Sequence, residues 1–265
     1  MKTLLRLSLA VVTAGALLLS GCNSSSSSDN GSSNNTSVNN FDSITQMINT
    51  TPKVDINQDT KNTLSYMGNE ERLAHDVYLN LYNYHAANGT NLQQLFNIGA
   101  NSETQHIKTV QLLVQKYITS PDEFSNVDMT ELNYKNTDVS NMVMGKYDIS
   151  HIQALYDQLY AKGIQSPQDA LEVGCMVEVV DINDLLVDIE TARNSNATDI
   201  VRAFEFLRDG SYNHYWAFDK GLKNMGINDG CCSLGNTYCH PEYPQNENQG
   251  GGNGNGKGNG NGKRK

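Results

Sequence analysis

Residues 101–114 of this 265-residue chain read NSETQHIKTVQLLV, and the stretch combines a helical period with two metal-binding residue types. Its apolar residues recur at intervals of three and four: Ile107, Val110, Leu113 and Val114. Glu103 and His106 precede them with the same spacing, so both side chains are expected on one helix face, a turn apart. Such a pair can supply a metal ion with one oxygen and one nitrogen ligand, or can simply form a hydrogen bond within itself.

The same period extends along much of the chain and predicts an all-α fold. Four long helices are expected, over residues 58–87, 91–117, 167–193 and 197–223. Ser166 and Pro167 are typical of the N-cap and first residue of the third helix. The segment between the second and third helices is long and contains a short helix over 148–162, ended by Gly163. Two helices, a long crossover and two further helices describe a four-helix bundle.

The other long helices also place ligand-forming residues on or beside their apolar stripes. A bare carboxylate is costly to bury, so these residues must be paired or bound to a metal. The candidate metal ligands are Glu71, Glu103, His106, Glu178, Asp181 and His214. Tyr78, seven residues after Glu71, is a candidate hydrogen-bond partner of a ligand carboxylate.

Several of these positions have a second interpretation. The helix phase favours Glu71 over Glu70 as the inward-facing residue, which leaves Glu70 in solvent. His75 follows Glu71 by four residues and is expected on the surface. Asp181 can instead lie on the exposed side of its helix, beside other polar residues.

The ligand order resembles that of the ferritin-like di-iron proteins, including rubrerythrins and bacterioferritins. More closely, EERLAHDVY (70–78), NSETQH (101–106), ALYDQL (154–159) and SYNH (211–214) look like the uncharacterised ferritin-like family known as domain of unknown function 2202. This resemblance covers residues 60–225 and implies a ferritin-like four-helix bundle, but no settled activity. One position departs from the di-iron pattern, because Ser211 stands where a second Glu-x-x-His would place its carboxylate. Asp181 could replace that carboxylate; otherwise one metal ion or none is bound.

Carboxylates and imidazoles without thiolates favour iron or manganese over a structural zinc site. We expect two iron ions, or manganese, bridged by Glu71 or Glu178, which could support oxidase or peroxidase-like redox activity. The chain has no Cys-x-x-Cys pair of the rubredoxin type, so the electron donor stays unidentified. The alternative is a non-catalytic binding module with a degenerate or single-metal site.

Three cysteines follow the last predicted helix. Either Cys231 or Cys232 can form a disulfide with Cys239, whereas a bond between the two adjacent cysteines would be strained. The three could instead act with His240 as a heavy-metal scavenger, although their spacing is not that of a zinc site. Cys175 is expected to be a small buried apolar residue, and no partner is assigned to it.

Residues 1–21 have the features of a signal peptide, because Lys2 and Arg6 precede an apolar run too short to span a bilayer. LSGC (19–22) resembles a bacterial lipobox, which implies that Cys22 is acylated and inserted in a lipid bilayer. The implied location is the cell envelope, facing the periplasm, and Asn23 favours the outer membrane. An ordinary cleaved signal is the alternative.

The remaining chain divides by composition into four parts. A Ser- and Asn-rich linker spans residues 22–40, the helical bundle 41–227, a cysteine-rich loop 228–245 and a Gly/Asn/Lys tail 246–265. Residues 41–245 hold 13 of the 19 basic and 27 of the 29 acidic residues, within a chain of net charge -10. Such a body repels phosphate, which argues strongly against nucleic acid as a partner. A homodimer is compatible with the sequence.

Overall fold

The computed structural model describes residues 41–123 and 137–245, and these residues form helices and connecting turns without a β-strand among them. The predicted signal peptide, Cys22, the linker and the tail lie outside the described residues. The α-helices are α1 (Phe41–Thr50), α2 (Gln58–Ala87), α3 (Gln93–Asn97), α4 (Thr104–Tyr117), α5 (Ser150–Gly163), α6 (Pro167–Asn194) and α7 (Thr198–Asn224). The predicted all-α class is confirmed.

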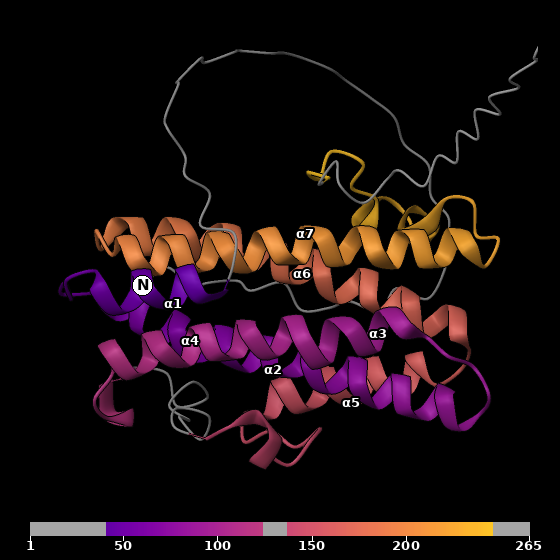
Figure 1. Cartoon of the computed structure of the whole chain (residues 1–265), viewed down its shortest axis with the longest axis horizontal. Coiled ribbons are helices and arrows are strands. Elements are labelled where there is room, and N and C mark those ends of the chain that lie inside the picture. Colours follow the sequence, from indigo (N-terminus) through magenta and orange to yellow (C-terminus); the bar gives the residue numbers. More distant parts are fainter. Residues whose placement is uncertain (1–40, 124–136, 246–265) are drawn as a thin grey trace, which may run out of the picture.

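The long helices form two layers, with α6 and α7 in one and α2 beside α3 and α4 in the other (Figure 1). A short turn joins α6 to α7, and the two pack along their length. The crossover between α4 and α6 carries α5, which packs against α2 and α6. No helix in the two described ranges has the length and apolar character needed to cross a bilayer.

The helix boundaries follow from the capping residues. Asn57 Oδ1 accepts a hydrogen bond from the Thr60 amide at 2.8 Å and starts α2. Ser166 Oγ accepts one from the Asp169 amide at 3.0 Å, and Pro167 follows as the first residue of α6. The predicted helices over 58–87, 148–162, 167–193 and 197–223 are confirmed, with small shifts at their ends.

The prediction of one uninterrupted helix over 91–117 is wrong in one respect. A π-helical segment, η1 (Ile98–Glu103), separates α3 from α4. Near its start the chain approaches α2 so closely that a Cβ on Gly99 would lie 3.1 Å from Leu79 Cγ. The apolar period could not reveal this segment because both flanking helices keep their own period. Helix α1 was also missed, since its buried residues Ile44 and Ile48 form only a short pattern.

The apolar core consists of two clusters with a polar layer between them. One cluster surrounds Tyr78, Val177 and Phe218 near α5, and the other surrounds Val110 and Phe204 near α1. Along α2 and α7, Glu71 and His214 lie where one cluster gives way to the other, and on α6 Glu178 and Asp181 lie at the end of the first cluster. The polar layer is therefore held on both sides by packed apolar side chains.

Buried polar contacts fasten the crossover to α2. The Arg72 guanidinium donates hydrogen bonds to the carbonyls of Val143 at 2.9 Å and Lys146 at 2.6 Å. Tyr147 donates one to Asp76 Oδ2 at 2.8 Å. His75, expected on the surface, is buried, and its Nδ1 lies 2.8 Å from Asp76 Oδ1.

One disulfide attaches the segment after α7 to the bundle, and a second closes a short loop within that segment. Cys175 on α6 is bonded to Cys231, and Cys232 is bonded to Cys239. The adjacent cysteines thus take different partners, and it is Cys232 that pairs with Cys239. Cys175 is buried as expected, and its partner is Cys231, a cysteine 56 residues away to which no sequence pattern linked it.

The two disulfides are expected to differ in their effect on stability. Replacing Cys175 and Cys231 together by alanine should lower the free energy of unfolding by about 4 kcal/mol, because the bond closes a long loop in the unfolded chain. Replacing Cys232 and Cys239, seven residues apart, should cost about 2 kcal/mol. Denaturant unfolding without reductant measures both, and a larger loss from the second pair would contradict this assignment.

Candidate metal centre

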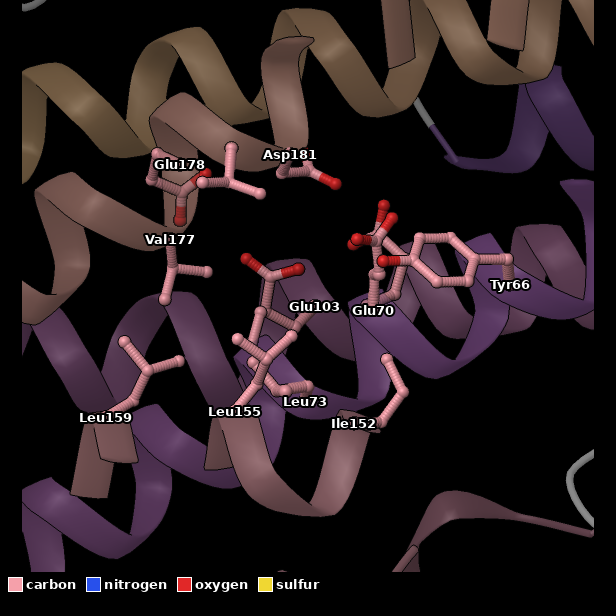
Figure 2. A pocket seen from close by; sticks show the side chains of 13 residues that line it. Tyr66, Glu70, Leu73, Glu103, Ile152, Leu155, Leu159, Val177, Glu178 and Asp181 are labelled. Atoms are coloured by element: carbon pink, nitrogen blue, oxygen red, sulfur yellow. The ribbon is translucent and has the colours of Figure 1, made fainter. Parts of the chain in front are cut away.

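Carboxylates from α2, η1 and α6 converge in the polar layer at the middle of the bundle. Figure 2 shows Glu103 pointing toward Glu178 and Asp181. Two imidazoles, from His106 on α4 and His214 on α7, complete the cluster. All of these side chains are buried.

The first group of possible ligands is formed by Glu71, Glu103 and His106. His106 Nδ1 lies 3.0 Å from Glu71 Oε2 and 3.2 Å from Glu103 Oε2. The Glu103–His106 contact is the one expected from their spacing, but Glu71 joins it from another helix. Three ligand atoms therefore meet where a single cation could replace the proton between them.

The second group is formed by Glu103, Glu178 and His214. His214 Nδ1 lies 3.0 Å from Glu103 Oε1 and 3.4 Å from Glu178 Oε2. Glu103 thus offers one oxygen to each group, with the two imidazole rings 5.5 Å apart. The residue shared by both groups is Glu103, whereas Glu71 and Glu178, the two expected bridging ligands, each belong to one group.

The π-helical segment aims two successive residues at one imidazole. Ser102 Oγ lies 2.6 Å from His214 Nε2, while Glu103 Oε1 lies next to Nδ1 of the same ring. Successive residues of a regular α-helix point about 100° apart, so they seldom reach the two edges of one ring. π-Helical turns are frequent at functional sites, and this one orients His214 with Nδ1 toward the carboxylates.

The position of His106 depends on a glycine of α7. A Cβ on Gly210 would lie 2.5 Å from His106 Nε2 and 2.8 Å from Cε1. Only a residue without a side chain leaves room for the imidazole there. Gly210 therefore sets how deeply His106 can enter the space between α4 and α7.

Asp181 and Tyr78 lie beside these groups and not within them. Ser211 donates a hydrogen bond to Asp181 Oδ2 at 2.6 Å. Asp181 is buried, so the alternative that it lies on the exposed side of its helix is wrong. Tyr78 donates one to Glu178 Oε1 at 2.5 Å, as expected of a hydroxyl that orients a ligand carboxylate. Ser211 of α7 thus holds Asp181 beside the two groups and supplies no carboxylate itself.

Burial and mutual charge set the protonation of the metal-free cluster. Burial raises the pKa of Glu71 to about 7, although His106 opposes this shift. Burial alone would lower the pKa of His214, but Glu178 and Glu103 outweigh it and raise that pKa to about 9. The pKa of Asp181 is raised well above its usual value by burial and by the nearby carboxylates. At neutral pH, bound protons therefore reduce the repulsion between carboxylates that would otherwise all be negatively charged.

The donor set fits a resident cation. Glu71 Oε1 is buried without a hydrogen-bond partner, and His214 Nδ1 makes none of good geometry despite its two carboxylate neighbours. Such atoms are costly to leave unsatisfied in a protein interior. A divalent cation coordinated by both groups would satisfy each of them.

The sequence missed three residues of the site. Glu70, expected in solvent, is half-buried and lines a small cavity together with the carboxylates of the cluster. Ser102 acts through its contact with His214, and Gly210 acts by leaving room for His106. No spacing rule predicts either role. The helical period did indicate the six candidate ligands, all of which the structure places in or next to the cluster.

The fold and site define an all-helical bundle protein with buried glutamate–histidine groups that could hold a metal ion. The chain belongs to the family described as Uncharacterized protein domain (DUF2202), which matches residues 60–237. It is similar to the uncharacterized protein MJ0754 of Methanocaldococcus jannaschii, with 36% identity over 183 residues, or 69% of this chain and 85% of the relative. A crystal structure of hypothetical protein MJ0754 matches with a TM-score of 0.54 and 34% identity, over 67% of this chain and 87% of that one.

The contact between Ser102 and His214 should be measurable through metal affinity. Replacing Ser102 by alanine is expected to weaken binding at the His214 group about tenfold, because the imidazole loses the partner that orients it. Replacing it by threonine keeps a hydroxyl and should restore most of the affinity. Calorimetric titration with Mn²⁺ checks this, and equal affinities for alanine and threonine would contradict the role.

Metal affinity should also rise with pH. A protonated imidazole cannot bind a metal, and the pKa of His214 is raised to about 9 in the metal-free protein. Between pH 6 and 8.5 the association constant at the His214 group should therefore increase by about tenfold per pH unit for each proton displaced, and level off above pH 9. Titrations in buffers of different ionisation enthalpy count the released protons, and no proton release at pH 7 would refute the sign.

Proposed function

We propose that this protein is a ferritin-like metal-binding protein whose bundle holds two divalent ions, iron or manganese, at the Glu71–Glu103–His106 and Glu103–Glu178–His214 groups. The observation that carries the proposal is the shared carboxylate of Glu103, which offers one oxygen to each group. Two helix pairs joined by a long crossover support the ferritin-like arrangement.

The residues present fit iron or manganese best. Each group supplies oxygen from two carboxylates and nitrogen from one imidazole, with no thiolate. Such ions, when bound, would supply one-electron redox chemistry toward dioxygen or peroxide. The chain's own contribution is to hold the ligands apart from bulk water and to orient Glu178 through Tyr78.

A second candidate is a site for a single ion without turnover. It is favoured by Ser211, which supplies no carboxylate from α7 and leaves Asp181 outside both groups. A scavenger that uses the late cysteines is less well supported, because all four cysteines of the described residues are in disulfides. A paired sulfur is not available as a thiolate ligand.

We also propose that the protein is attached to the bacterial cell envelope through an acylated Cys22 and faces the periplasm. Support comes from the lipobox-like residues before Cys22 and from the two disulfides, which are typical of oxidising compartments. The outer membrane is favoured by Asn23.

The metal content of the purified full-length protein tests the proposal. After anaerobic reconstitution with Fe²⁺ or Mn²⁺, elemental analysis should find about two ions per chain. Replacing Glu103 by glutamine keeps its size but removes the shared charge, so the content should fall to at most about one. Glu205→Gln on the outer side of α7 is the matched control and should retain both ions.

Other outcomes have defined meanings. One ion in the wild type would favour the single-ion alternative. Metal-free wild-type protein after reconstitution, with an intact helical circular dichroism spectrum, would refute both candidates. Equal metal content in Glu103→Gln and wild type would refute the shared role of Glu103.

A further inference from the structure

A cavity of ≈ 40 Å³ lies against the carboxylate side of the candidate centre (Figure 2). Glu71, Glu103 and Glu178 form one side of it, and aliphatic side chains from α2, α5 and α6 form the other. Leu155 and Leu159 of α5 face the carboxylates across this space. The cavity is therefore polar on the ligand side and apolar on the α5 side.

The two imidazoles do not line this cavity. His106 and His214 approach the carboxylates from α4 and α7, and no residue of α7 contributes to the lining. A molecule in the cavity would therefore meet the carboxylates and not the imidazoles. The buried, unpartnered Glu71 Oε1 belongs to a residue that lines the cavity.

The opening of the cavity is marked by the lining residues that are only half-buried. Among the described residues these are Glu70 on α2, Leu155 on α5 and Val180 on α6. The deeper aliphatic residues, such as Leu159 and Val177, are buried. A molecule entering from outside would thus pass between α2, α5 and α6, beside Glu70, Leu155 and Val180.

The lining also restricts the charge of what can enter. Five carboxylates contribute to it, including Glu70 and Asp181, and no basic residue does. An anion would lose its hydration there without finding a cationic side chain to pair with. A hydrated ion would also lose water against the aliphatic wall, at a high free-energy cost. An uncharged molecule with apolar surface pays neither cost and gains from burial.

We propose that this cavity is a binding site for a small uncharged molecule with apolar surface, which reaches the carboxylate side of the centre past Leu155. As a route to the metal ions the assignment rests on the proposed function, but as a binding site it does not. Helix α5 of the crossover is then the element that selects what reaches the centre.

Xenon is a suitable probe, because it is uncharged and enters apolar cavities in proteins. Its affinity for the metal-free full-length protein can be measured by ¹²⁹Xe NMR, and its place by crystals under xenon pressure. Wild-type crystals should show xenon between Leu155 and the carboxylates. Replacing Leu155 by tryptophan should weaken binding by about tenfold or more, because the larger side chain fills the space.

Two further variants keep the test decisive. Leu155→Ala enlarges the cavity and should bind xenon more tightly than wild type. Gln158→Trp places the same large side chain on an exposed position of α5 and should leave binding unchanged. If Leu155→Trp fails to fold, the alanine variant and its control still decide the outcome.

Xenon bound only elsewhere, or equal affinity in wild type and both Leu155 variants, would overturn the assignment. A protein that binds xenon here but takes up no metal would refute the proposed function and leave the binding site standing. Uptake of two ions without xenon in the cavity would overturn this inference alone.

Discussion

Glu103 places one carboxylate oxygen beside each of two buried imidazoles, and both candidate groups of the polar layer depend on that contact. Burial alone would raise the pKa of this carboxyl, yet His214 and His106 hold it well below its usual value. Without them, the charge would be costly in the interior of a helical bundle. The two apolar clusters on either side of the polar layer keep water away and hold the helices at the separation that this contact requires.

The features that could be predicted from the sequence are those that follow from a regular helical period. The bundle, the crossover helix and the inward direction of Glu71 and Glu178 all depend only on which residues share a helix face. His106 and His214 were indicated by their positions relative to neighbouring apolar residues. These predictions needed no knowledge of which helices touch, because each ligand faces the common interior.

The features that could not be predicted depend on contacts between distant segments or on a break in the period. Whether Cys175 meets Cys231 is decided by how the segment after α7 folds back onto α6. His75 is buried by the crossover contacts of its neighbour Asp76. The role of Gly210 depends on the imidazole of His106, which occupies the space that a side chain at position 210 would need.

The π-helical segment has a consequence for how this protein can change by mutation. It contains one residue per turn more than a regular helix would, within Ile98–Glu103. Loss of a single codon in that segment would remove the extra residue and turn α4 by about 100° relative to α3. Glu103 and His106 would then leave the interior together, although no ligand had been substituted. An insertion or deletion at this point can thus separate Glu103 and His106 from the other groups without replacing either residue.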